Sequence, residues 1–140
     1  MKSQFTNHND QTIHKNNDQN KTEGMQPKPF NLEDRTLLFS KGIIQLCKKI
    51  SHDVINVRLI GQLIDASGSV GANYREANEA LSKKDFVYRL KITRKECKET
   101  SFWLELLKEA NPNFTEEVHC FVEESKELRN IFTSIIQKAG

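Results

Sequence analysis

Apolar side chains recur every three or four residues in four successive segments of this chain, and this spacing limits the fold more than any other feature. In an α-helix such residues line one face, which then packs against a neighbouring element. No segment shows the sustained alternation of apolar and polar residues that is expected of a half-buried strand. Because the breaks between segments are short, the sequence predicts an all-α protein, an antiparallel up-down-up-down four-helix bundle.

The helix ends are predicted from residues that cap or break helices. The expected helices span residues 31–50, 56–80, 83–110 and 115–138. Asn31, Ser82 and Thr115 each precede an apolar segment, and side chains of these types accept hydrogen bonds from the free N–H groups of a first turn. The apolar stripes that should form the core end at Leu81 in the second helix and at Ile135 in the fourth.

The N-terminal segment differs in composition from the rest of the chain. Residues 1–29 are rich in Asn, Gln, Lys and Asp and contain few large apolar side chains, so they cannot bury enough surface to offset their chain entropy. We expect a disordered polar tail over 1–29, followed by one bundle domain over 30–140. No apolar run approaches the roughly 18 residues of a membrane span, and the tail lacks the apolar core of a secretory signal. These observations predict a cytoplasmic protein without membrane contact.

Three cysteines and three glycines carry further structural predictions. Cys47, Cys97 and Cys120 are odd in number and widely spaced, which argues against a disulfide framework or a zinc site and favours reduced core thiols. Gly61, Gly68 and Gly71 interrupt the second helix, and each costs about 1 kcal/mol relative to alanine. A helix keeps such residues where another helix approaches its backbone, so close helix packing is predicted here.

A combination of short motifs in the second and third helices resembles a known family. The motifs are Ser67-Gly-Ser-Val-Gly-Ala-Asn73, Arg75-Glu76-Ala77, Glu99-Thr100, Trp103-Leu104 and Leu106-Leu107. The pattern resembles the bacterial four-helix bundle family named for open reading frames in 23S rRNA intervening sequences, over roughly residues 32–138. It is also similar to the accessory protein of diversity-generating retroelements, a basic bundle that binds nucleic acid. The resemblance implies a homo-oligomer, specifically a homopentamer; the chain departs from the pattern in its polar tail and its modest net charge of +2.

Charge is unevenly distributed in spite of the small total. Residues 82–104 contain seven basic and three acidic side chains, whereas residues 105–140 contain four basic and seven acidic ones. At 100° per residue, four lysines of the third helix fall within about 60° of one another. These four, here called the basic ridge, are Lys84, Lys91, Lys95 and Lys98.

The basic ridge is the candidate nucleic-acid-binding site. Tyr88 and Phe102 share its stripe, and Arg89 and Arg94 are predicted to flank it. Lysines neutralise phosphates and exposed aromatic rings stack on bases, so this arrangement suits RNA or DNA. The other interpretation, which the sequence leaves open, is a solvated lysine face whose aromatic residues are covered by a neighbouring subunit.

Two carboxylates raise the question of a catalytic or metal site. Glu76 and Glu99 lie on helices that should be neighbours, and with Ser67 and Asn73 they are expected to form a structural polar cluster. A carboxylate-bridged di-iron bundle needs two Glu-x-x-His motifs, and this chain has one. No histidine is placed beside a nucleophile. We therefore expect no catalytic residues, no metal and no cofactor.

The sequence thus favours a non-enzymatic bundle that binds RNA or DNA through a basic helix face as an accessory factor. The alternative is an oligomeric structural scaffold, or a protein-interaction scaffold with a protein partner, that does not bind nucleic acid. The acidic fourth helix and the basic third helix are expected to meet across a heterologous contact in a ring.

Overall fold

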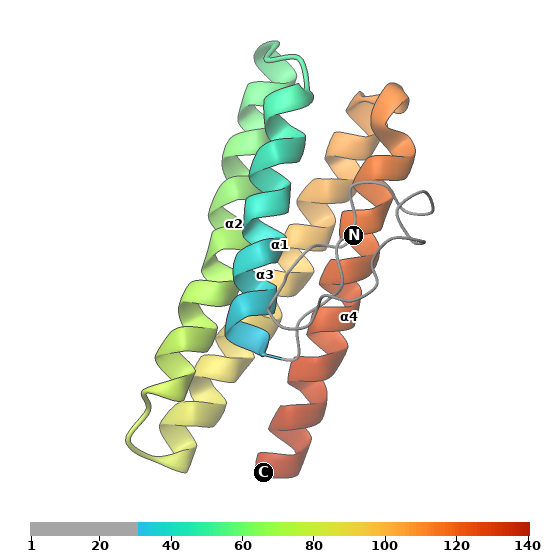
Figure 1. The fold of residues 1–140 in the computed structure, drawn as a ribbon. Coiled ribbons are helices and arrows are strands. Elements are labelled where there is room, and N and C mark those ends of the chain that lie inside the picture. The colour runs from blue at the N-terminus through green and yellow to red at the C-terminus, as the bar shows by residue number, and fades with distance from the viewer. Residues whose placement is uncertain (1–30) are drawn as a thin grey trace, which may run out of the picture.

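The computed structural model describes residues 31–140, and this part of the chain folds into four long helices (Figure 1). They are α1 (Leu32–Lys49), α2 (Val54–Asn78), α3 (Lys83–Ala110) and α4 (Thr115–Ala139), with a short 3-10 helix, η2 (Pro112–Phe114), before α4. Consecutive helices run antiparallel, and the all-α four-helix prediction is confirmed. The tail predicted over 1–29 lies outside the described residues.

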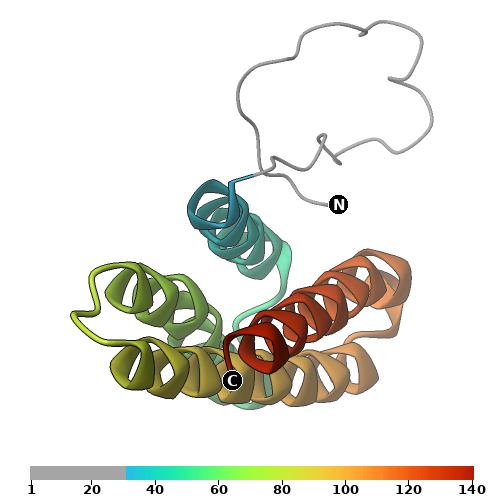
Figure 2. The same ribbon diagram turned by 90° about the horizontal axis from the view of Figure 1, so that it is seen from below.

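The four helices are not equivalent in their packing. Helix α3 lies between α2 and α4 and makes extensive contacts with both (Figure 2). Helix α1 lies on the other side of these three, and it contacts α2 much more than α4. The outer face of α3 therefore points away from α1, and no other helix of the described chain covers it.

The first helix and the third begin as predicted. The Asn31 side chain accepts hydrogen bonds from the backbone N–H groups of Glu33 at 2.7 Å and Asp34 at 3.2 Å. The Ser82 hydroxyl accepts one from the N–H of Asp85 at 3.1 Å. Both caps satisfy donors that have no partner within the helix.

The predicted cap of the fourth helix is wrong. Thr115 is the first residue of α4, and its hydroxyl donates to the carbonyl of Pro112 at 2.8 Å instead of accepting from the helix. The reason is that η2 leads directly into α4, so the backbone before Thr115 is already helical. At α2, the capping residue is Asp53, whose carboxylate accepts from the N–H of Asn56 at 2.8 Å.

The buried side chains form one core to which all four helices contribute. Its largest fully buried members are Phe39, Ile43, Leu46, Leu63, Leu90, Leu104, Leu107, Leu128 and Phe132. Two residues predicted for the core differ from this pattern. Leu81 is 99% exposed because α2 ends at Asn78, so the helical period no longer applies to it. Ile135 is half-buried, and its neighbour Ile136 points into the core.

Two of the three cysteines are in the core. Cys47 and Cys97 are buried, and burial raises the pKa of the Cys47 thiol to about 11 and raises that of Cys97 as well. Cys120 is exposed, which corrects the prediction that all three thiols are in the core. It lies on α4 next to the core-facing Phe121, and one step along a helix turns the side chain by 100°.

Only one of the three glycines of α2 mediates close helix packing within the chain. A Cβ atom at Gly71 would lie 3.0 Å from Oγ1 and 3.3 Å from Cβ of the fully buried Thr36 on α1, so only glycine fits without a shift. A Cβ at Gly61 or Gly68 would meet no atom within 4 Å. The packing prediction is confirmed for Gly71 and is wrong for the other two within a single chain.

A pair of amides joins the two connections at one end of the bundle. Asn56 at the start of α2 is 2% exposed, and its Nδ2 donates to Oδ1 of Asn111 at 3.0 Å. The Asn111 amide donates back to Oδ1 of Asn56 at 2.8 Å. The α1–α2 connection is thereby held to the end of α3, and these buried polar groups are satisfied.

Candidate nucleic-acid interface

The four lysines of the basic ridge lie on the outer face of α3. Lys84, Lys91 and Lys98 are spaced by two helical turns, and Lys95 lies one turn after Lys91. All four are exposed, as the spacing predicts, because the core-facing residues of α3 occupy the opposite side. At 1.5 Å per residue, the ridge extends over about 21 Å.

Acidic side chains do not neutralise the ridge within the described residues. The ion pairs of this part of the chain use other cations, namely Arg35, Lys49, Arg75, Lys108 and His119. None of the ridge lysines, and not Arg94 either, has a carboxylate within ion-pair distance among residues 31–140. The positive charge of this face is therefore available to an external anion.

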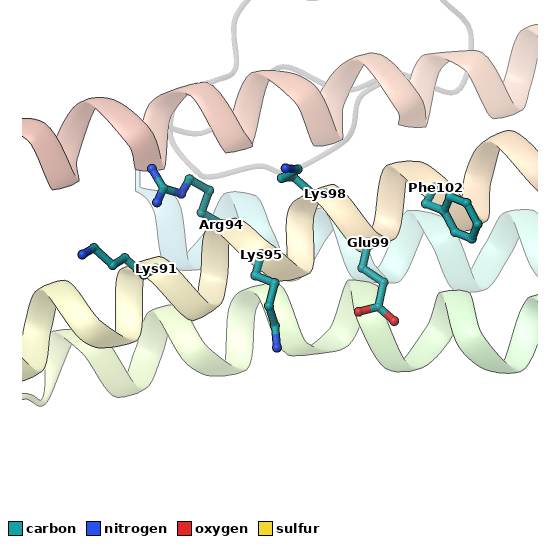
Figure 3. A pocket seen from close by; sticks show the side chains of 6 residues that line it. All are labelled: Lys91, Arg94, Lys95, Lys98, Glu99 and Phe102. Atoms are coloured by element: carbon teal, nitrogen blue, oxygen red, sulfur yellow. The ribbon is translucent and has the colours of Figure 1, made fainter.

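A shallow hollow of about 490 Å³ lies in the same face (Figure 3). Its lining residues are Lys91, Arg94, Lys95, Lys98, Glu99 and Phe102. Arg94 is half-buried and extends toward α4, whereas Glu99 points toward α2. Cations thus surround a space that also contains one aromatic ring and one carboxylate.

The aromatic residues of the stripe are exposed. Tyr88 is 58% exposed and Phe102 is 55% exposed. The Phe102 ring packs edge-on against Trp103, with 5.0 Å between ring centroids and 77° between planes. Exposed rings beside lysines are the combination that single-stranded nucleic acids use for stacking and phosphate contact.

Arg89 does not lie beside the ridge. It is half-buried on the side of α3 that faces α2, where its Nη1 donates to Oδ1 of Asn73 at 3.5 Å. Its position five residues after Lys84 corresponds to a turn of about 140°, which places it across the helix from the lysines.

The four residues expected to form a polar cluster do not come together in the described structure. Ser67 is buried and bonds to the carbonyl of Ile64, within its own helix. Asn73 bonds to the carbonyl of Ser69 and to Arg89. Glu76 is exposed near the end of α2, and Glu99 is exposed near the middle of α3. The cause is the antiparallel packing, which sets the end of α2 beside the start of α3.

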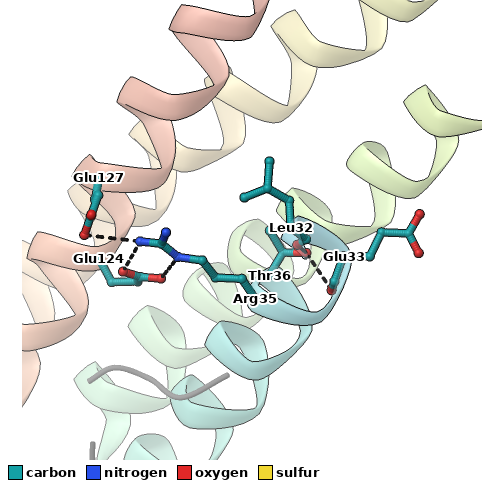
Figure 4. A network of polar contacts seen from close by, with 6 residues as sticks. All are labelled: Leu32, Glu33, Arg35, Thr36, Glu124 and Glu127. Atoms are coloured by element: carbon teal, nitrogen blue, oxygen red, sulfur yellow. Dashed lines mark hydrogen bonds and ion pairs between the residues drawn. The ribbon is translucent and has the colours of Figure 1, made fainter. Parts of the chain in front are cut away.

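A buried ion pair that the sequence did not indicate joins α1 to α4 (Figure 4). Nε and Nη2 of Arg35 donate to the two carboxylate oxygens of Glu124 at 2.8 and 2.9 Å, and Nη2 lies 3.2 Å from Oε1 of Glu127. Glu124 is 1% exposed. Burial acts to lower the pKa of Arg35, but the hydrogen bonds and charges of the two glutamates outweigh it and raise that pKa.

Other kinds of site were sought in the same residues. Within 31–140 no three His, Cys, Asp or Glu side chains are grouped so that they could hold a metal ion. None of the described helices is long and apolar enough to cross a membrane.

The fold and this face define a small all-α bundle protein with a basic outer helix. The chain belongs to the family described as 23S rRNA-intervening sequence protein, whose sequence pattern matches residues 31–134. A crystal structure of a protein of unknown function from the S23 ribosomal protein family of Bacteroides thetaiotaomicron is similar to it, with 33% identity and a TM-score of 0.69. That match covers 76% of this chain and 98% of the other. Among curated proteins, none matches the sequence.

Proposed function

We propose that this chain is a non-enzymatic cytoplasmic accessory protein that binds RNA or DNA through the basic ridge. The observation that carries the proposal is that Lys84, Lys91, Lys95 and Lys98 are exposed in one row and have no acidic partner among residues 31–140. Cations that are not neutralised internally release counterions from a phosphate backbone, and this release drives binding without sequence selectivity.

The first test replaces the four ridge lysines with glutamine and measures affinity for mixed-sequence RNA and duplex DNA. Release of about 0.7 counterions per phosphate contributes about fivefold per contact at 0.1 M salt. If three lysines contact phosphates at once, the variant should bind about a hundredfold more weakly. The slope of log affinity against log salt should also become shallower by about 2.

A matched control separates position from total charge. Lys41, Lys48, Lys126 and Lys138 are exposed on α1 and α4, and their replacement by glutamine removes the same number of charges. This control variant should keep nearly all of the affinity. Equal losses in the two variants, or no binding by the original chain at low salt, would refute the ridge as the binding surface.

The second candidate function is that of an oligomeric scaffold, and the outer face of α1 and α2 favours it. Leu37 and Ile44 of α1 are 42% and 44% exposed, and Val57 and Ile64 of α2 are 52% and 37% exposed. Gly61 and Gly68 lie on the same stripe of α2 as these two apolar residues, since steps of three, four and seven residues share a helix face. Their bare backbone would let a second copy approach closely. The family resemblance makes a homopentamer the expected assembly.

Glutamate at Gly61 and Gly68 tests this assembly. In an isolated chain the new side chains meet open space and improve helix propensity, so stability should rise by about 0.5–1 kcal/mol per site. On an occupied interface they would add bulk and charge, so light scattering should show a shift to the monomer mass. A wild-type chain that is monomeric at micromolar concentration, or a variant that assembles like the wild type, would contradict this candidate.

A further inference from the structure

We infer that the hollow on α3 seats one base of a single-stranded nucleic acid and favours bases that carry an exocyclic amino group. This inference rests on the proposed function, because the ridge lysines would hold the flanking phosphates. It adds a specific role for two residues that the electrostatic proposal does not use. Phe102 would stack on the base, and Glu99 would accept a hydrogen bond from the base edge.

Phe102 is placed to act as a stacking platform. More than half of the side chain is exposed, although a large apolar ring gains by being covered. Its edge-on contact with Trp103 holds the ring in position without covering it. Lys98 lies one turn earlier on α3 and lines the same hollow, so a stacked base would have a phosphate partner at hand.

Glu99 is held in place by the same tryptophan. Nε1 of Trp103 donates to Oε2 of Glu99 at 3.2 Å, which fixes the carboxylate at the edge of the hollow. The other oxygen, Oε1, has no hydrogen-bond partner among residues 31–140. A carboxylate only accepts hydrogen bonds, so it suits the amino group of cytosine or adenine and not the carbonyl at the corresponding position of thymine.

The face of α3 suits a single strand better than a duplex for this contact. The bases of a duplex are paired and stacked on each other, so their faces are closed to a side chain. A strand without a partner can turn one base onto Phe102 while its phosphates follow the ridge. Cations along the ridge and a ring within the same hollow thus favour a single-stranded ligand.

The test compares two oligonucleotides that differ only in the base edge, a twelve-residue dC strand and a twelve-residue dT strand, at one salt concentration. The wild type should bind dC several-fold more tightly. In Glu99→Gln the ratio of dC to dT affinity should fall toward one, because the glutamine amide also donates to the thymine carbonyl. Removing a negative charge changes both affinities equally, so the ratio reports hydrogen bonding alone.

Phe102→Leu should lower affinity for both single strands by about tenfold, within the range found for one stacked base, and leave duplex affinity unchanged. Trp103 is the only tryptophan in the chain, so its fluorescence reports occupation of the hollow directly. Binding of dC should quench it in the wild type and in Tyr88→Leu, which removes the exposed ring outside the hollow. Quenching should be lost in Phe102→Leu.

The outcomes separate this inference from the proposed function. Loss of binding only in the ridge-lysine variant, with equal dC and dT affinities and no effect of Phe102→Leu, would overturn the base site and leave the proposed function intact. Absence of any binding at low salt would overturn both.

Discussion

Replacing Glu124 with alanine is expected to destabilise the protein by about 3–5 kcal/mol. The substitution leaves the Arg35 guanidinium, itself only 8% exposed, without the bidentate partner that compensates its removal from water. Chemical denaturation followed by circular dichroism measures the loss. Because this pair is the main polar contact between α1 and α4, hydrogen exchange should rise first in α1.

Two further variants test the physical reason. Glu127→Ala removes the partly exposed second carboxylate, whose side chain is 52% exposed, and should cost less than about 1 kcal/mol. The double variant Arg35→Leu with Glu124→Leu removes both charges and should recover much of the stability lost in Glu124→Ala. A double variant as unstable as the single one would show that packing, and not the uncompensated charge, sets the cost.

Phe132→Ala is expected to destabilise the protein by about 3–5 kcal/mol through the cavity that it leaves. Phe132 is fully buried on α4, and its ring lies 5.4 Å from that of Tyr74 on α2. At about 4 °C per kcal/mol, the melting temperature should fall by more than 10 °C. Calorimetry at a fixed protein concentration gives the value.

Phe102→Ala is the matched control for this cavity. The same change of side chain on the 55% exposed residue of α3 removes little buried surface and should alter stability by less than about 0.5 kcal/mol. A large loss in the control would mean that another copy of the chain covers Phe102 in solution. A small loss at Phe132 would show that the core refills the space.

The helices were predictable because each one has a continuous apolar stripe and a polar break at its ends. The predicted boundaries agree with the observed ones to within two residues. Leu81 and Thr115 were misplaced because both lie at the junctions, where a helical period gives no information. The exposed positions of the ridge lysines also followed from sequence, since 100° per residue fixes which side of α3 they share.

Contacts between helices were less accessible. The Arg35–Glu124 pair joins residues that are 89 positions apart, and only the packing of α1 against α4 brings them together. The proposed polar cluster failed because a prediction of neighbouring helices does not fix how far along each helix two residues lie. Arg89 did carry a usable signal, because its angle from the lysines could be counted from the sequence.

The central position of α3 has a consequence for the charges that it carries. A helix braced along its length by two others is expected to open last, while α1, attached mainly through α2, can separate from α4 without disturbing it. The lysines would then keep their spacing through local openings that reach most of the bundle. The ridge acts in this respect as a rigid ruler, and a ligand that fits it would find the same distances in every thermally accessible state.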